Sequence, residues 1–269
     1  MGTEAEIYVP GKMITYETYL VHLSRYVFAT QFIHSGADIL DIATGSGYGA
    51  SYLAGKGARN VVGADLDEII IRIANSGYRK PNLTFMLANA EELPFSDGSF
   101  DIVCSMGTID HLRNPDKFLA DSRRILHNGG CFICSVLNRK LITPPPFKRI
   151  IDPCHRIEYS PTELTGLVNR YFDNVQLYYQ ESGKIRWIKM RRAAYYLMYR
   201  KLHVPDASTA LMQRFLRLAG NRDLRFMTYA EETIDKDFAD GNRWIAALTD
   251  KIDSKIFNYM VVARKERVK

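Results

Sequence analysis

The sequence predicts an α/β fold in which helices cover a doubly wound, Rossmann-like sheet of seven strands. Three observations lead to this prediction. Short apolar segments alternate with helical segments from residue 38 onward, a glycine-rich loop follows the first apolar segment, and a strand-like segment closes the chain. Such alternation is typical of parallel strands that are buried on both faces. We expect a mostly parallel sheet whose last strand is antiparallel.

The first half of the chain contains four predicted strands. Before them, Tyr19, Leu23 and Tyr26 lie at helical spacing and predict an N-terminal helix over 15–32. Apolar runs predict strands over 38–43, 61–65, 83–88 and 100–106, and helical spacing predicts helices over 48–54, 68–75 and 116–126.

The second half begins with a predicted turn over 127–130 and a fifth strand over 131–136. Three prolines, residues 144–146, force an irregular loop, because each lacks a backbone donor and restricts its predecessor. The remaining predicted elements are a helix over 161–171, a strand over 175–179, helices over 184–202 and 209–218, and a last strand over 257–263.

These elements divide the chain into three parts. We predict an N-terminal helical cap over 1–35, a core formed by 36–183 and 255–269, and a helical, basic insertion over 184–254. The insertion holds seven Lys and Arg residues between 183 and 205 and no acidic residue in that stretch, whereas the whole chain has a formal net charge of +6. We expect a lid with a solvated cationic face; the alternatives are a surface for an acidic or nucleotide-linked substrate, or a peripheral membrane contact. Nucleic acid is the least favoured partner.

Composition is that of an average soluble globular protein, with 269 residues, 46% hydrophobic and 25% charged. The longest uncharged stretches, 42–55 and 125–138, have 14 residues each, fewer than the roughly 18 apolar residues of a membrane span. We therefore expect no transmembrane segment. Because the N-terminal residues also lack a secretory pattern, we expect a cytoplasmic location. The oligomeric state stays open.

The glycine loop, residues 41–47 (DIATGSG), predicts a ligand site after the first strand. Gly45 and Gly47 allow the backbone to approach a ligand closely, and the following helix supplies unpaired N–H groups. Asp65 follows Gly45 by twenty residues and is placed to bind ribose hydroxyls. These features suit NAD and S-adenosylmethionine equally.

Two polar residues favour S-adenosylmethionine. Asp41 at the strand end would repel a pyrophosphate but attract an ammonium group, directly or through water. Asn89, after the third strand, offers a donor and an acceptor to an adenine edge.

Five ordered motifs carry a resemblance to a known family. They are DIATGSG at 41–47, VVGAD at 61–65, ANAEELPF at 88–95, FDIVCSMGTIDHL at 100–112 and LHNGGCFICSV at 126–136. In this order they resemble the class I S-adenosylmethionine-dependent methyltransferases, over about 15–265. HLSRYVFA at 22–29 and DPCHRIEYSPTEL at 152–164 are further similar to methyltransferases of glycan and secondary-metabolite gene clusters.

The resemblance implies S-adenosylmethionine as cofactor. It implies cofactor contacts by the residues Asp41, Ala43, Gly45, Gly47, Asp65, Leu66, Asn89, Ala90 and Met106. Arg25 is placed to bind the cofactor carboxylate as a fork, and a solvated helix face is its alternative.

Two histidines are candidates for a catalytic base. His111 follows the fourth strand and His155 lies on a later loop, and either imidazole could take a proton from an acceptor hydroxyl or ammonium. Asp110 could orient His111 or bind substrate, and Tyr159 is a weaker candidate. We expect no metal site.

The predicted function is methyl transfer to oxygen or nitrogen of a small molecule, with a sugar or secondary metabolite favoured by the narrower resemblance. Two alternatives stay open: an NAD-dependent oxidoreductase, and a catalytically silent protein that binds the cofactor or a partner.

Overall fold

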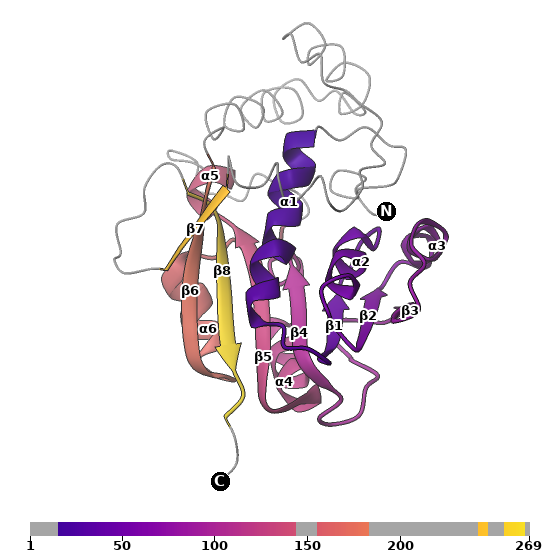
Figure 1. Ribbon diagram of the computed structural model, residues 1–269. Helices are drawn as coiled ribbons and strands as arrows, with labels where there is room; N and C mark the ends of the chain where they lie inside the picture. Colours follow the sequence, from indigo (N-terminus) through magenta and orange to yellow (C-terminus); the bar gives the residue numbers. More distant parts are fainter. Residues whose placement is uncertain (1–15, 144–154, 183–241, 247–255, 267–269) are drawn as a thin grey trace, which may run out of the picture.

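The computed structural model describes residues 16–143, 155–182, 242–246 and 256–266 (Figure 1). The helices in these ranges are α1 (Tyr16–Ala29), the 3-10 helix η1 (Thr30–Phe32), α2 (Tyr48–Ala54), α3 (Glu68–Gly77), α4 (Pro115–Ile125), α5 (Arg139–Ile142) and α6 (Pro161–Val168). The strands are β1 (Asp38–Ile42), β2 (Asn60–Asp65), β3 (Leu83–Leu87), β4 (Phe100–Met106), β5 (Leu126–Leu137), β6 (Asp173–Ser182), β7 (Asn242–Ala246) and β8 (Ile256–Arg264).

The strands form one mixed sheet in the order β3-β2-β1-β4-β5-β8-β6-β7. β3, β2, β1, β4 and β5 pair in parallel, whereas β8 runs antiparallel to β5 and to β6. The predicted α/β fold is therefore confirmed, with all seven predicted strands and an antiparallel last strand. β7 adds an eighth strand at the edge, antiparallel to β6.

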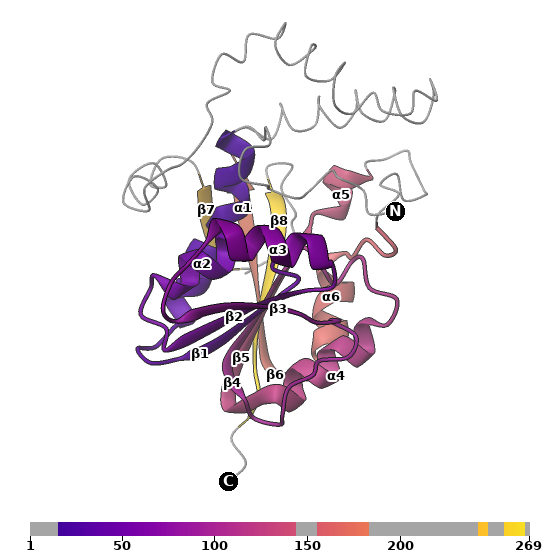
Figure 2. The same ribbon diagram turned by 90° about the vertical axis from the view of Figure 1, so that its right-hand side faces the viewer.

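Helices cover both faces of the sheet, and an apolar core lies on each side (Figure 2). α1 and α2 pack on one face, where Leu23 and Leu53 are buried against Ile133 of β5. α4 and α6 pack on the other face, where Phe118 is buried against Phe132. Neighbouring residues of β5 point to opposite faces, as expected for a strand that is buried on both sides.

Local sequence signals begin three of the helices. The Asp67 carboxylate accepts hydrogen bonds from the first turn of α3, and the Asn114 side chain accepts one from the backbone N–H of Lys117 in α4. Ser160 and Glu163 form a reciprocal capping box at the start of α6. Such caps satisfy backbone donors that have no partner inside the helix.

Several predicted elements differ from the structure. The N-terminal helix changes to 3-10 geometry after Ala29, and α6 ends at Val168 instead of continuing to residue 171. The turn predicted over 127–130 does not end a strand: these residues lie within the bounds of β5 as a bulge between Leu126, which pairs with Phe100, and Cys131, which pairs with Ile102. β7 lies inside the segment 184–254, which was predicted to be helical.

Several predictions fall outside the described residues. They concern the proline loop over 144–146, the helices over 184–202 and 209–218, and with them the basic segment. None of the helices in the described ranges is long and apolar enough to cross a membrane.

Candidate functional site

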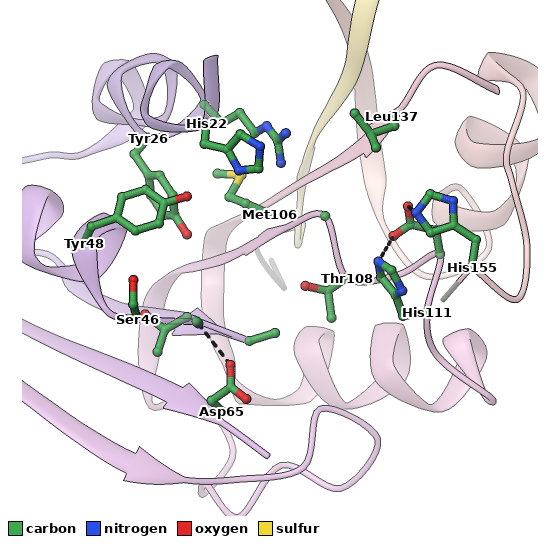
Figure 3. A pocket seen from close by; sticks show the side chains of 16 residues that line it. His22, Tyr26, Ser46, Tyr48, Asp65, Met106, Thr108, His111, Leu137 and His155 are labelled. Carbon is green, nitrogen blue, oxygen red and sulfur yellow. Dashed lines mark hydrogen bonds and ion pairs between the residues drawn. The ribbon is translucent and has the colours of Figure 1, made fainter. Parts of the chain in front are cut away.

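A cavity of about 330 Å³ opens at the carboxyl ends of β1, β2, β4 and β5 (Figure 3). Ligands of open α/β sheets bind at this edge. The residues that line it are His22, Arg25, Tyr26, Ala43, Thr44, Gly45, Ser46, Tyr48, Asp65, Met106, Gly107, Thr108, Asp110, His111, Leu137 and His155. Most of the predicted site residues are therefore brought together here.

The glycine loop forms one wall of the cavity. Ala43, Gly45 and Gly47 all have positive φ, at 59°, 57° and 88°. Open space surrounds the position of a Gly45 Cβ, whereas a Cβ on Gly47 would lie 2.6 Å from the Phe85 ring. Gly45 is thus needed for its backbone conformation and Gly47 also for packing. The family motif that DIATGSG resembles has glycine at the position of Ala43. The left-handed conformation costs roughly 1–2 kcal/mol for alanine there.

Asp65 lies at the end of β2 and holds the loop from below (Figure 3). One carboxylate oxygen accepts a hydrogen bond from Gly45 N at 3.0 Å, and the other accepts one from Asp67 N at 3.1 Å. Burial raises the pKa of Asp65, against the lowering effect of these backbone N–H groups. Each oxygen has a further lone pair, so the carboxylate can accept bonds from a ligand diol as well.

Asp41 is fully buried and lies behind the cavity wall. Thr44 Oγ1 donates to its carboxylate at 2.6 Å, and the Tyr26 hydroxyl lies 3.3 Å from both carboxylate oxygens. Burial raises the pKa of Asp41 to about 7. In this arrangement Asp41 makes no direct contact with the cavity, and its charge acts through Thr44 and Tyr26.

α1 brings a buried arginine to the cavity. Arg25 is only 4% exposed, and its Nε has no hydrogen-bond partner among the described residues. Its Nη1 lies 3.2 Å from where a Cβ on Gly107 would be, so a side chain there would require the guanidinium to shift by a few tenths of an ångström. The alternative prediction for Arg25, a solvated helix face, is wrong. A buried guanidinium that lines a cavity is suited to bind an anionic group.

The residues predicted to surround an adenine lie outside the cavity lining. Asn89 is exposed, and its Oδ1 accepts a hydrogen bond from Glu91 N at 2.9 Å, which is the geometry of a local turn. Ala90 is 7% exposed. Leu66, which follows Asp65 in the chain, is 68% exposed, and Ile69 is 67% exposed.

The far end of the cavity holds Asp110, His111 and His155 (Figure 3). Asp110 Oδ1 lies 3.8 Å from His111 Nε2, and Asp110 Oδ2 lies 3.5 Å from His155 Nε2. The two imidazole rings meet edge to face, with centroids 4.7 Å apart. Asp110 and His155 are buried, whereas the His111 side chain is 28% exposed. The group can bind or deprotonate a polar ligand atom.

Sequence reasoning missed several members of this site, and Glu158 and Tyr26 matter most for its chemistry. Glu158 Oε1 lies 3.6 Å from His155 Nδ1 and accepts a hydrogen bond from Thr143 Oγ1 at 2.9 Å. Tyr26 was assigned only to the helix core, although it also lines the cavity. The motif over 152–164 contains Glu158 and was the available signal. Tyr159 is 6% exposed, and burial raises its pKa to about 12.

Comparisons with known proteins agree with the motifs. The methyltransferase domain family matches residues 40–134. A probable S-adenosylmethionine-dependent methyltransferase of Mycolicibacterium smegmatis is 34% identical over 134 residues, which are 50% of this chain and 51% of that protein. The phthiotriol/phenolphthiotriol dimycocerosates methyltransferase of Mycobacterium tuberculosis is 36% identical over 105 residues, 39% of each chain.

The fold is shared with solved structures at low sequence identity. The cyclase SpnF aligns with a TM-score of 0.60 at 16% identity, over 91% of this chain and 82% of that one. This likeness concerns the fold alone. The chain spans about half the length of the first curated relatives that it matches.

Proposed function

We propose that this chain, whose residues 40–134 belong to the class I S-adenosylmethionine-dependent methyltransferase family, transfers a methyl group to an oxygen or nitrogen atom of a small molecule. One observation carries the proposal. The cavity has the glycine loop and Asp65 at one end, and Asp110, His111 and His155 at the other. A group-transfer enzyme has to bind the donor and the acceptor side by side, and the two ends of this cavity offer different side chains for the two ligands.

At the cofactor end, each polar group has a partner on S-adenosylmethionine. Asp65 accepts the two ribose hydroxyls, and Arg25 binds the carboxylate of the methionine part as a fork. The Asp41 charge favours the neighbouring ammonium through Thr44 and Tyr26. Leu66 supplies an apolar surface for the adenine ring, with Asn89 and Ala90 at its edge.

At the acceptor end, the bound cofactor supplies a methyl group that is already activated on a sulfonium. The protein has to orient the acceptor, exclude water and provide a route for the proton that the acceptor loses on methylation. The half-buried His111 lies on the cavity wall within reach of Asp110, so this pair is placed to take the acceptor proton. Met106 and Thr108 line the cavity between the cofactor end and the acceptor end, where the methyl group would pass.

The acceptor class rests on resemblance. The motifs at 22–29 and 152–164 are similar to those of methyltransferases from glycan and secondary-metabolite clusters, which favours sugars and secondary metabolites. One relative is named for phthiotriol and phenolphthiotriol dimycocerosates, so hydroxylated lipids belong in the same screen. A cytoplasmic location is consistent with such acceptors.

Calorimetric titration with S-adenosylhomocysteine, with NAD in parallel, tests the cofactor. We expect micromolar binding of S-adenosylhomocysteine and none of NAD. Asp65→Asn should weaken binding about 10- to 100-fold, since a hydrogen bond to a charged group contributes roughly 1.5–3 kcal/mol.

Asp67→Asn is the matched control for Asp65→Asn. The Asp67 carboxylate caps α3 and does not line the cavity, and asparagine caps a helix about as well as aspartate, so affinity should stay unchanged. Binding of NAD alone would overturn the proposal. Transfer of a radiolabelled methyl group to any acceptor of the screen would exclude the silent alternative.

A further inference from the structure

We propose that Asp110, His111 and His155 bind one divalent transition-metal cation at the acceptor end of the cavity. Each residue offers one ligand atom, and the three atoms lie within 4.8 Å of one another. Two imidazoles and one carboxylate form a common donor set for such cations, and small side-chain movements bring their atoms to coordination distance. No metal site was expected from the sequence, in which His155 is 45 residues away from Asp110.

The surroundings of His155 supply a second, independent observation. Its Nε2 faces Asp110 Oδ2 at 3.5 Å, while its other ring nitrogen, Nδ1, faces Glu158 Oε1 at 3.6 Å. Thr143 Oγ1 donates a hydrogen bond to the same glutamate oxygen at 2.9 Å. A metal-bound histidine characteristically presents its second ring nitrogen to a carboxylate, which sets the tautomer and the ring orientation.

The backbone holds the two parts of the site together. The N–H groups of Arg156 and Ile157 lie 2.9 Å and 3.2 Å from the Asp110 carbonyl oxygen, in hydrogen-bond geometry. These bonds tie the residues after His155 to the loop that follows β4. Ligands from two distant segments are thus positioned by main-chain contacts before any ligand arrives, which a specific metal site requires.

The donor set limits the kind of cation. Imidazole nitrogen suits Zn²⁺, Cu²⁺, Ni²⁺ and Fe²⁺, whereas Ca²⁺, Mg²⁺ and Mn²⁺ prefer oxygen ligands. Three protein ligands leave coordination positions open, and all three residues line the cavity. An oxygen atom of a ligand in the cavity can therefore reach the cation.

The position of the cation at the acceptor end also suggests its role in the reaction, and this role rests on the proposed methyl transfer. A cation at this point lowers the pKa of an acceptor hydroxyl that approaches it, so the O–H proton leaves to solvent water. The acceptor oxygen then forms a bond to the methyl carbon while the carbon–sulfur bond breaks and its electron pair stays on sulfur. When the cation is bound, both imidazoles are ligands and the three residues hold the cation; the proposed direct proton transfer to His111 then applies to the cation-free protein only.

Titration of the tag-free, chelator-treated chain with Co²⁺ tests the site. We expect visible d–d absorption that saturates at one equivalent. His111→Ala and His155→Ala should each abolish the saturable band, and Glu158→Gln should weaken binding about 10- to 100-fold. His34→Ala is the matched control, because His34 Nε2 also lies 3.8 Å from an aspartate oxygen, that of Asp101, but on an exposed side chain.

A measurement on the unaltered protein keeps the test decisive if a variant fails to fold. Two exchangeable imidazole N–H resonances, shifted by bound Co²⁺, should appear in the proton NMR spectrum. Absence of the saturable band in the wild-type chain, or its survival in a folded His111→Ala/His155→Ala double variant, would overturn the cation site.

Calorimetry with S-adenosylhomocysteine separates this proposal from the proposed function. Loss of Co²⁺ binding with retained S-adenosylhomocysteine binding in His155→Ala supports the cation site. Co²⁺ binding in a wild-type chain that binds no S-adenosylhomocysteine would contradict the methyltransferase and leave the cation site standing.

Discussion

Asp41 illustrates how burial controls the charge of a single residue. Its carboxyl group is fully buried, and burial raises its pKa to about 7, although hydrogen bonds from Thr44 and Tyr26 oppose the shift. Asp65 adds a neighbouring negative charge that raises the pKa further. Near neutral pH, the folded protein therefore takes up a proton at a position where the unfolded chain holds a carboxylate.

The raised pKa of Asp41 predicts a specific pH dependence of stability. Its contribution to folding is fully present below about pH 4 and is lost as pH rises through about 7, because the folded state binds the proton more tightly. Between pH 5 and 8 the wild-type chain should lose up to about 3 kcal/mol relative to Asp41→Asn. Urea unfolding of both proteins at the two pH values measures the difference.

The same titration checks the predicted role of Asp41 in binding. The ionised form attracts an ammonium group, so affinity for S-adenosylhomocysteine should rise from pH 6 to 8 in the wild-type chain more than in Asp41→Asn. Equal pH profiles of both stability and affinity in the two proteins would show that Asp41 does not titrate in this range.

At the scale of elements, α1 and α2 meet at a contact that admits no side chain. Gly49 lies in α2, and a Cβ there would lie 2.0 Å from the Tyr26 ring of α1. Tyr26 is 2% exposed and its hydroxyl points to Asp41, so the ring has little room to move. This close approach places α1, and with it Arg25, over the cavity.

Gly49→Ala should therefore be destabilising despite the higher helix propensity of alanine. We expect a loss of about 1–3 kcal/mol, as for other overpacked cores, together with weaker S-adenosylhomocysteine binding. Gly166→Ala in α6 is the control, because nothing lies within 4 Å of the added methyl group; it should stabilise by about 0.5–1 kcal/mol. Thermal and urea unfolding measure both, and a neutral Gly49→Ala would contradict the close packing.

Elements with one dominant local signal were predictable from the sequence. β4 and α2 have the predicted bounds, since an apolar run and helical spacing decide them without help from distant residues. β7 was missed because Asn242–Ala246 is stabilised as a strand by pairing with β6, a contact about 64 residues away in the chain. The turn residues His127–Gly130 likewise indicated a chain reversal, but they form a bulge between Leu126 and Cys131, which both pair with β4, and Gly129 N donates to the Lys265 carbonyl oxygen after β8.

At the scale of the whole molecule, topology explains which site residues were predictable. The carboxyl ends of parallel strands meet at one edge, so Gly45, Asp65, Met106 and His111 could be placed together from strand order alone. The contact of Glu158 with His155 and the burial of Arg25 depend on how segments outside the parallel strands pack. Asn89 lies outside the cavity lining, and its Oδ1 accepts a hydrogen bond from Glu91 N within a local turn, a contact that strand order does not predict.

A buried polar chain joins α1 to the antiparallel half of the sheet. Gln180 of β6 donates a hydrogen bond to Ser24 Oγ of α1 and accepts one from Asn258 of β8, and all three side chains have 0% exposure. Ser24 precedes Arg25, so this chain fixes the part of α1 that carries the arginine to the cavity. The parallel strands thus form the cavity directly, and the antiparallel strands β6 and β8 contribute to it by positioning α1.

Gln180→Met should show this coupling, because methionine keeps the volume but removes both hydrogen bonds. Buried polar groups that lose a partner cost roughly 1–3 kcal/mol each, so we expect a loss of about 2–4 kcal/mol in unfolding free energy. Affinity for S-adenosylhomocysteine should fall as well, since Arg25 loses its anchor. Gln176→Met is the control at an exposed position of β6; it removes only the hydrogen bond from the Tyr178 hydroxyl, so it should change stability by less than about 1 kcal/mol and leave affinity unchanged. A Gln180→Met variant with lower stability but full affinity would mean that Tyr26 and Gly49 alone position α1, and that the antiparallel half supports the fold without shaping the cofactor end of the cavity.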